Sequence, residues 1–227
     1  METKAFSELF PLFSSANPEI LDWLLSIAEE QDYSPDEKVL EAETWGRAVY
    51  FIVSGWIKIQ RTYKEQAIAV EILGRGHSFG EMAILDEPLR STEAIALTEV
   101  TLLSISAQRY LQLLFKEPQL QHRSHQLTMR QLRSWQNRYL LKYQTSGERL
   151  AKTLVLLAEN YGQVTEKGTE IFNLSRQDLA QVAELEEEEV QRIMEKLRSK
   201  GWVEINASDQ ILRLTNPKQL THLAGHI

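Results

Sequence analysis

Cysteine is absent from all 227 residues of the chain. Its absence excludes disulfide bonds, zinc sites built from thiolates and iron–sulfur clusters held by cysteine. The sequence also lacks any run of about 18 apolar residues, the length that a membrane-spanning helix needs, and its N-terminus lacks a basic segment followed by an apolar run. Because 43% of the residues are hydrophobic, the chain can still build the core of one large domain or two ordinary ones. We therefore expect a globular, cytoplasmic protein.

Positive charge is scarce, since 25 Lys and Arg residues against 32 Asp and Glu residues leave a net charge of -7. This balance disfavours DNA binding, because Lys and Arg contacts to phosphates supply most of its nonspecific affinity. The basic residues are distributed unevenly along the chain, however. Residues 118–147 contain no acidic residue and five basic ones: Arg123, Arg130, Arg133, Arg138 and Lys142. This stretch is either an anion-binding surface or a solvated basic face that offsets acidic charge elsewhere.

The segment 79–92 carries the strongest functional signal, and it reads Phe-Gly-Glu-Met-Ala-Ile-Leu-Asp-Glu-Pro-Leu-Arg-Ser-Thr. Gly80 lets the backbone approach a ligand, and a short helical turn offers amide N–H groups to an anion. The carboxylate of Glu81 can hold ribose hydroxyls, and Arg90, nine residues later, can clamp a phosphate. These groups meet the needs of a cyclic nucleotide. The alternative is a surface loop in which Glu81 and Arg90 only pair with each other.

This segment resembles the phosphate-binding cassette of cyclic-nucleotide-binding domains, and the chain around it resembles the CRP/FNR family of bacterial regulators. The resemblance implies that Glu81 binds a ribose hydroxyl and Arg90 the phosphate. Ser91 and the amides of Gly80 and Met82 would bind the remaining oxygens. The effector is then cyclic AMP or cyclic di-GMP, which this segment does not distinguish, and no further cofactor is implied. The lack of cysteine rules out the oxygen-sensing branch of the family.

Short β runs predict the sensor domain of that family between residues 38 and 106. The runs are 49–53, 56–60, 68–73, 92–96 and 100–105, with glycines at the turns between them. Before them, residues 5–31 carry apolar side chains at helical spacing, interrupted by Asn17-Pro18. We therefore expect a compact antiparallel roll with short covering helices.

The pattern of residues 107–143 predicts a helix, and we expect its long central part to begin at Pro118. The family pairs this helix with its twin in a homodimer. Two alternative packing faces can be read along this helix. One combines polar and apolar residues, and the other, which is more apolar, consists of Met129, Leu132, Gln136, Tyr139 and Tyr143. The family also places base contacts on this helix. Arginine can pair with guanine and tryptophan can stack on a base, so the candidate ligand-binding residues are Arg130, Arg133, Ser134, Trp135 and Arg138.

A different pattern follows the polar break at residues 144–147. Arg149–Tyr161 predicts an amphipathic helix, and a loop is expected from there to Thr169. Two helices follow, one capped by Ser175 and one spanning 186–199, and then two short strands that form a hairpin.

This order of elements is a winged helix–turn–helix, and residues 174–180, Leu-Ser-Arg-Gln-Asp-Leu-Ala, resemble the DNA-binding domain of the family. We therefore predict an α+β chain of three parts. They are a cyclic-nucleotide-binding β-roll over 1–116, a central dimerisation helix over 117–144, and a winged helix–turn–helix domain over 145–227.

The helix that should read DNA begins with four glutamates at 186–189, and the span 170–204 holds nine acidic and five basic residues. Acidic residues suit a helix N-terminus but repel DNA. The resemblance places DNA or partner contacts at Ser175, Arg176, Gln177, Glu187, Glu188 and Arg192. We expect weak direct DNA binding and output through a protein partner, such as another transcription regulator. The alternative is an ordinary effector-dependent transcription factor that binds DNA.

Catalysis and metal binding find little support in the sequence. No nucleophile has a plausible base partner, and Gly74-Arg75-Gly76 is too short for a P-loop. His122 and His125 share a helix face but have no carboxylate or cysteine nearby to complete a metal site. We therefore expect neither an enzyme nor a metalloprotein.

Overall fold

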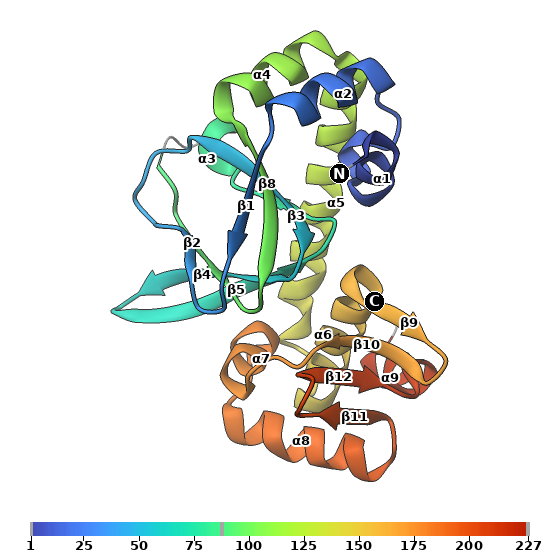
Figure 1. The fold of residues 1–227 in the computed structure, drawn as a ribbon. Helices are drawn as coiled ribbons and strands as arrows, with labels where there is room; N and C mark the ends of the chain where they lie inside the picture. The colour runs from blue at the N-terminus through green and yellow to red at the C-terminus, as the bar shows by residue number, and fades with distance from the viewer. Residues whose placement is uncertain (1, 87–88, 226–227) are drawn as a thin grey trace. The chain divides into compact units, whose positions relative to one another are not determined.

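The computed structural model describes residues 2–86 and 89–225 (Figure 1). Its contacts divide the chain into two units. The first consists of Met1–Ile68 and Leu73–Arg133, and the second of Ala69–Ile72 and Ser134–Ile227. The long helix α5 (Pro118–Leu141) contributes to both units, because the division falls inside it. The predicted division into three parts stays a prediction.

Two four-stranded sheets form the β-roll of the sensor domain (Figure 1). One has the order β1 (Glu29–Tyr33), β8 (Val100–Ser106), β3 (Ala48–Ser54) and β6 (Ser78–Phe79). The other has the order β2 (Lys38–Leu40), β7 (Glu93–Ala96), β4 (Trp56–Tyr63) and β5 (Gln66–Gly74). The five predicted runs are confirmed as β3, β4, β5, β7 and β8.

Three strands of the roll were not predicted. The sequence of β1, Glu-Glu-Gln-Asp-Tyr, is polar and largely exposed, and the strand exists because its backbone pairs antiparallel with β8 from Glu29 to Tyr33. Such an edge strand is held by backbone pairing rather than by an apolar pattern. The other two, β2 and β6, are only three and two residues long.

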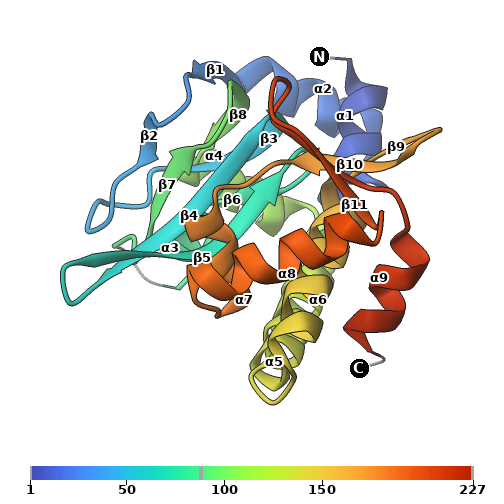
Figure 2. The same ribbon diagram turned by 90° about the horizontal axis from the view of Figure 1, so that it is seen from below.

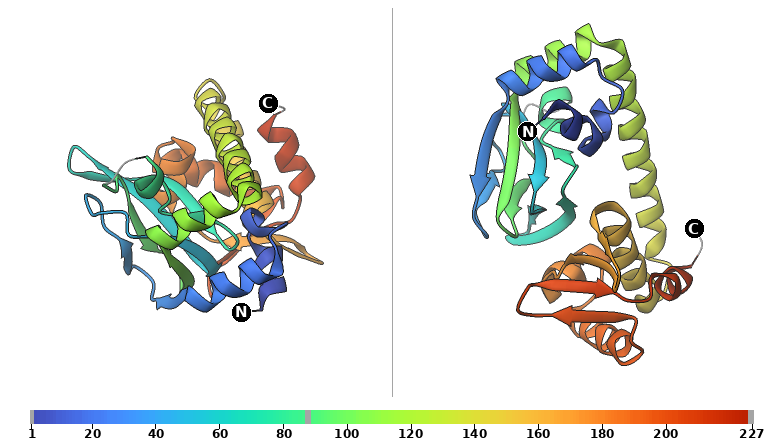
Figure 3. Two further views of the ribbon diagram at one scale, coloured as in Figure 1. Left: turned by 90° about the horizontal axis from the view of Figure 1, so that it is seen from above. Right: turned by 45° about the vertical axis from the view of Figure 1, so that its right-hand side comes forward.

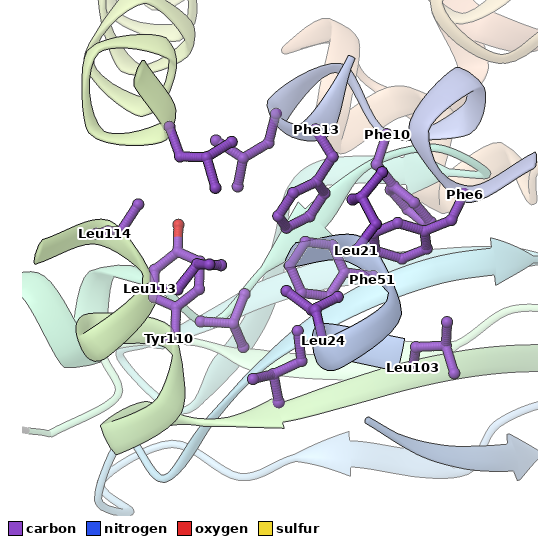
Figure 4. Packing of buried hydrophobic residues seen from close by; sticks show 14 residues of the cluster. Phe6, Phe10, Phe13, Leu21, Leu24, Phe51, Leu103, Tyr110, Leu113 and Leu114 are labelled. Atoms are coloured by element: carbon purple, nitrogen blue, oxygen red, sulfur yellow. The ribbon is translucent and has the colours of Figure 1, made fainter. Parts of the chain in front are cut away.

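Short helices cover the first sheet through an aromatic cluster. The helices are α1 (Thr3–Leu9), the 3₁₀ turn η1 (Pro11–Phe13), α2 (Pro18–Ile27) and α4 (Ala107–Lys116). The rings of Phe6, Phe10 and Phe13 gather around Phe51 of β3, with centroids 5.3 to 6.0 Å from it (Figure 4). The interruption predicted at Asn17-Pro18 is confirmed, since Asn17 caps α2 by accepting from the amide of Glu19.

The predicted helix over 107–143 consists of two helices, α4 and α5, which meet at a bend (Figure 3). Glu117 leaves the helical region at φ -119° and ψ 87°. The cause is Pro118, because proline disfavours helical geometry in the residue before it. Pro118 begins α5, as expected.

The C-terminal domain consists of a small sheet and four helices. The sheet has the order β11 (Val203–Asn206), β12 (Ile211–Leu214), β10 (Gly168–Phe172) and β9 (Gln163–Thr165). The helices are α6 (Ser146–Tyr161), α7 (Arg176–Ala183), α8 (Glu187–Ser199) and α9 (Pro217–Ala224). Figure 2 shows α7 and α8 joined by a short turn, which confirms the helix–turn–helix prediction. The predicted β11–β12 hairpin is also confirmed.

Three details of this domain were predicted wrongly or missed. The helix α6 begins at Ser146 rather than Arg149, because Thr145 and Glu148 form a capping box at its start. The loop expected up to Thr169 contains β9 and the start of β10, and these two strands pair antiparallel. The helix α9 was not predicted.

Candidate functional site

The cassette lies between β6 and β7, around the short helix α3 (Met82–Leu85). Gly80 has φ +93°, a conformation that favours glycine. A Cβ atom at this position would lie 2.9 Å from Nη1 of Arg90 and 3.1 Å from the carbonyl oxygen of Ala48. The glycine therefore provides both the turn and the space into which Arg90 fits.

Arg90 is buried, with only 6% of its surface exposed. Its Nη2 donates to the carbonyl of Ala48 at 3.1 Å and its Nη1 makes a long contact of 3.5 Å to the carbonyl of Gly80. Its guanidinium also lies 5.8 Å from the ring centroid of Tyr50. Burial lowers the pKa of Arg90 below its ordinary value, while Tyr50 and Glu81 oppose this shift. The site thus holds a desolvated guanidinium whose hydrogen-bond partners among the described residues are neutral carbonyls, which suits an anionic ligand.

Glu81 precedes α3, and its side chain is half-buried. Burial raises the pKa of its carboxyl group, and a backbone hydrogen bond and the charge of Arg90 oppose that rise. Its Oε2 is buried and accepts no hydrogen bond from the residues that the structure describes. A buried acceptor without a donor is rare and calls for a ligand or water to satisfy it. The burial of the Arg90 side chain and of Oε2 of Glu81 argues against a surface loop in which the two residues form an exposed ion pair.

Three residues of this neighbourhood were not predicted from the sequence. Ala48 and Tyr50 reach Arg90 because β3 pairs with β6, which places Tyr50 opposite Phe79, and these two rings stack at 5.3 Å. Tyr110 of α4 is buried, and burial together with the charge of Glu81 raises its pKa to about 12. None of the three has a residue type or spacing that identifies it, because their positions depend on strand register and tertiary packing.

The other predicted cassette residues lie at the surface. Met82 is 66% exposed at the first position of α3, and Ser91 is exposed directly after Arg90. The amides of the first turn of a helix have no partner within that helix and can bind an anion. Met82 therefore contributes its backbone to the candidate site.

The predicted ligand-binding residues of α5 fall into two groups. Arg130 and Arg133 are exposed and belong to the same unit as the cassette. Ser134, Trp135 and Arg138 belong to the second unit, where Ser134 is exposed and Trp135 is 41% exposed. Arg138 is half-buried and already donates hydrogen bonds to the backbone carbonyls of two valines of that unit, Val70 and Val182.

All six predicted DNA or partner contacts of the C-terminal domain are exposed: Ser175, Arg176, Gln177, Glu187, Glu188 and Arg192. Ser175 also caps α7, since its Oγ accepts from the amide of Asp178 at 3.0 Å and donates to the carboxylate of Asp178 at 2.7 Å. Arg176 donates to the side-chain oxygen of Gln191 on α8. The start of α7 and the face of α8 are therefore joined by side chains as well as by the turn.

The four consecutive glutamates do not act alike. Glu186 caps α8 and forms a capping box with Glu189. Glu189 also accepts a hydrogen bond of 2.6 Å from Ser146 of α6, and this bond is the main cause that lowers the pKa of its carboxyl group. Only Glu187 and Glu188 have no such role in the described contacts. The acidic surface at the start of α8 is thus smaller than the sequence suggests.

A β-roll with this cassette, a long helix and a winged helix–turn–helix together define an effector-responsive transcription regulator. Residues 30–117 match the cyclic nucleotide-binding domain, and residues 148–223 match the Crp-like helix–turn–helix domain. The cyclic AMP receptor protein of Thermus thermophilus is 30% identical over 200 residues, which cover 86% of this chain and 88% of that protein. The chain belongs to the CRP/FNR family of transcription regulators, which are not enzymes, and both expectations are confirmed.

Solved structures show the same fold. FixK2 from Bradyrhizobium japonicum has a TM-score of 0.77 at 20% identity, covering 88% of this chain and 99% of that chain. The c-di-GMP responsive global regulator CLP of Xanthomonas campestris has a TM-score of 0.67 at 21% identity, covering 88% of this chain and 100% of that chain. These likenesses confirm the predicted α+β architecture. Within the described part of the chain, no helix is long and apolar enough to span a bilayer.

Proposed function

We propose that this regulator senses a cyclic nucleotide through its cassette, with Arg90 on the phosphate and Glu81 on a ribose hydroxyl. The observation that carries the proposal is the buried Oε2 of Glu81, which lacks a donor among the described residues beside a buried guanidinium. A ribose hydroxyl would donate to this oxygen, and a phosphate would neutralise Arg90. Ser91 and the backbone amides of Gly80 and Met82 complete the proposed site.

We further propose that cyclic di-GMP is the preferred effector. It carries two phosphates and two guanines, which suit the exposed Arg130 and Arg133 and the partly exposed ring of Trp135 on α5, with Ser134 beside them. The name of CLP is consistent with this preference, although its likeness to this chain concerns the fold alone. Cyclic AMP is the alternative, and the name of the Thermus thermophilus relative favours it.

A side-by-side titration tests the effector. Cyclic AMP, cyclic GMP and cyclic di-GMP are titrated in separate calorimetric runs into the wild-type protein and into Trp135→Ala. We expect cyclic di-GMP to bind most tightly and the alanine variant to lose about 1 to 3 kcal/mol of binding free energy if the ring stacks on a base. Tight binding of cyclic AMP without a response to cyclic di-GMP would reject the preference.

For the output, we propose a homodimer that binds DNA weakly and acts through a protein partner with a basic surface, such as another transcription regulator. The support is the exposed pair Glu187 and Glu188 at the start of α8, where the family has its DNA contacts. Like charges in an interface cost several kcal/mol, a large share of the roughly 4 to 10 kcal/mol that separate specific from nonspecific DNA binding.

Direct DNA binding is the second candidate output, and the match to the Crp-like helix–turn–helix together with the exposed Arg176 and Arg192 favours it. Fluorescence anisotropy with a palindromic DNA library, with and without nucleotide at about 150 mM salt, separates the two outputs. We expect weak, nonspecific binding. Nanomolar binding to one palindrome that is lost in Arg192→Ala would establish the ordinary transcription factor instead.

A further inference from the structure

The last turns of α5 contain an arginine, Arg138, whose surroundings differ from those of Arg130 and Arg133 on the same helix. Arg138 is half-buried, whereas Arg130 and Arg133 are exposed. Its Nη2 donates to the carbonyl of Val182 at 2.9 Å, and its Nη1 donates to the carbonyl of Val70. Arg138, Val70 and Val182 all belong to the second unit. One guanidinium therefore joins α5 to two backbone carbonyls far away in the sequence.

Val182 lies in the last turn of α7, where carbonyl groups lack partners within the helix. The amide of Glu184, which ends the helix with φ +56°, bonds to the carbonyls of Ala180 and Gln181. The amide of Leu185 bonds to the carbonyl of Ala180. The carbonyl of Val182 is satisfied by Arg138 instead. A cation at this end of α7 also suits the negative end of the helix dipole.

The charged and aromatic groups around Arg138 favour this arrangement. Glu184 and Glu71 are the two carboxylates whose charges act on its guanidinium. The guanidinium carbon lies 5.6 Å from the ring centroid of Trp135, one turn earlier on α5. Trp135 is the ring on which we propose that a base of the effector stacks. Arg138 therefore contacts both the proposed ligand-binding face of α5 and the first helix of the helix–turn–helix.

We propose that Arg138 is a positioning residue that ties α5 to the end of α7 and transmits effector binding to the helix–turn–helix. The proposal rests on the proposed function for the effector, and it replaces the predicted contact between Arg138 and the ligand. A planar guanidinium can serve two carbonyls in fixed directions, whereas a lysine ammonium cannot reproduce this geometry. A base that stacks on Trp135 changes the packing of the Arg138 side chain, and the change reaches α7 through Val182.

Hydrogen exchange of the α7 amides, followed by mass spectrometry, tests the proposal. The variants are Arg138→Gln, Arg138→Lys and the control Arg61→Gln, which removes the same charge from an exposed site on β4, outside the proposed binding residues. Each is measured with and without saturating cyclic di-GMP and cyclic AMP, and nucleotide binding is measured in parallel by calorimetry. Circular dichroism checks the folding of each variant.

We expect α7 to exchange at least about tenfold faster in Arg138→Gln than in wild type, the factor for losing a hydrogen bond to a charged group. Arg138→Lys should show a smaller increase, and Arg61→Gln none. Nucleotide should change the exchange of α7 in wild type and in Arg61→Gln, but not in Arg138→Gln, although this variant still binds nucleotide. If Arg138→Gln does not fold, the comparison of Arg138→Lys with Arg61→Gln decides.

Two results would overturn the proposal. The first is an equal exchange rate of α7 in the Arg138 and Arg61 variants, which would show that Arg138 does not hold α7. The second is a nucleotide-induced change of α7 exchange that keeps its full size without Arg138, which would show that the signal takes another route. If no nucleotide binds to the wild type, the proposed effector is wrong and so is the transmission. The exchange rates measured without nucleotide then test only whether Arg138 holds α7 against α5.

Discussion

Single residues of the sensor domain show a conflict between stability and function. Charged groups are rarely buried unless they are paired, yet the Arg90 side chain and the Oε2 atom of Glu81 are both buried here. One oxygen of Glu81 lacks a donor among the described residues, and the hydrogen bonds described for Arg90 go to neutral carbonyls. Such sites destabilise a fold unless a ligand completes them. We therefore expect these two residues to lower the stability of the protein and to recover it when nucleotide binds.

The substitution Glu81→Gln tests whether the Glu81 carboxylate lowers the stability of the fold, because that effect depends on pH. Because burial raises the pKa of Glu81, the folded protein binds more protons than the unfolded chain between the ordinary pKa and the raised one. The contribution of Glu81 to stability is thus fully present below the ordinary pKa and is lost as pH rises through the raised pKa. Urea unfolding at a series of pH values should show this loss in wild type but not in Glu81→Gln, which should be the more stable protein at neutral pH. Parallel pH profiles would contradict the burial of a charged carboxylate.

The substitution Gly80→Ala tests the space that Arg90 occupies. The Cβ atom would meet Nη1 of Arg90 at 2.9 Å in a backbone conformation of φ +93°, so we expect a loss of about 1 kcal/mol or more in stability. Nucleotide affinity should fall about tenfold or more as Arg90 is displaced. Gly147→Ala is the matched control, because its Cβ would meet no atom within 4 Å, and it should leave affinity unchanged. Equal affinities of the two variants would remove Gly80 from the site.

At the scale of helices and strands, the features that depend on neighbouring residues could be predicted from the sequence. Pro118, Asn17 and Ser175 mark helix starts through interactions with their own neighbours, so each boundary was found. The spacing of Glu81 and Arg90 within one loop was likewise visible. Strands such as β1 and the contacts of Tyr50 depend on pairing between distant segments, which a residue pattern does not record.

The start of α8 provides a prediction at this scale, because its glutamates have different roles. Glu189→Ala removes the capping box and the hydrogen bond from Ser146, so we expect thermal unfolding to begin a few degrees lower. Glu188→Ala, which is exposed and outside these contacts, should unfold as wild type does but bind DNA more tightly at low salt. Calorimetric unfolding and fluorescence anisotropy check the two statements. Equal unfolding temperatures for both variants would show that Glu189 has no structural role.

At the scale of the whole molecule, α5 exposes an apolar seam to water. Its helical members, Met129, Leu132 and Tyr139, are exposed by 51% to 61%. Tyr143, predicted to belong to the seam, is 76% exposed and lies in the turn after α5. An exposed apolar surface of this kind marks an interface, which agrees with the proposed homodimer. We expect Leu132→Asp to give a monomer in analytical ultracentrifugation, and Asn137→Asp, on the opposite side of the helix, to leave the dimer intact. A Leu132→Asp protein that stays dimeric would place the interface elsewhere.

The central claim is that a cyclic nucleotide binds through Arg90, and titration calorimetry of Arg90→Ala tests it most directly. The control is Arg61→Ala, an exposed arginine of β4 in the same domain. Removing a charge-assisted contact should cost about 1.5 to 3 kcal/mol, so we expect nucleotide affinity to fall at least about tenfold in Arg90→Ala while Arg61→Ala binds as wild type does. A folded Arg90→Ala protein with unaltered nucleotide affinity would contradict the account.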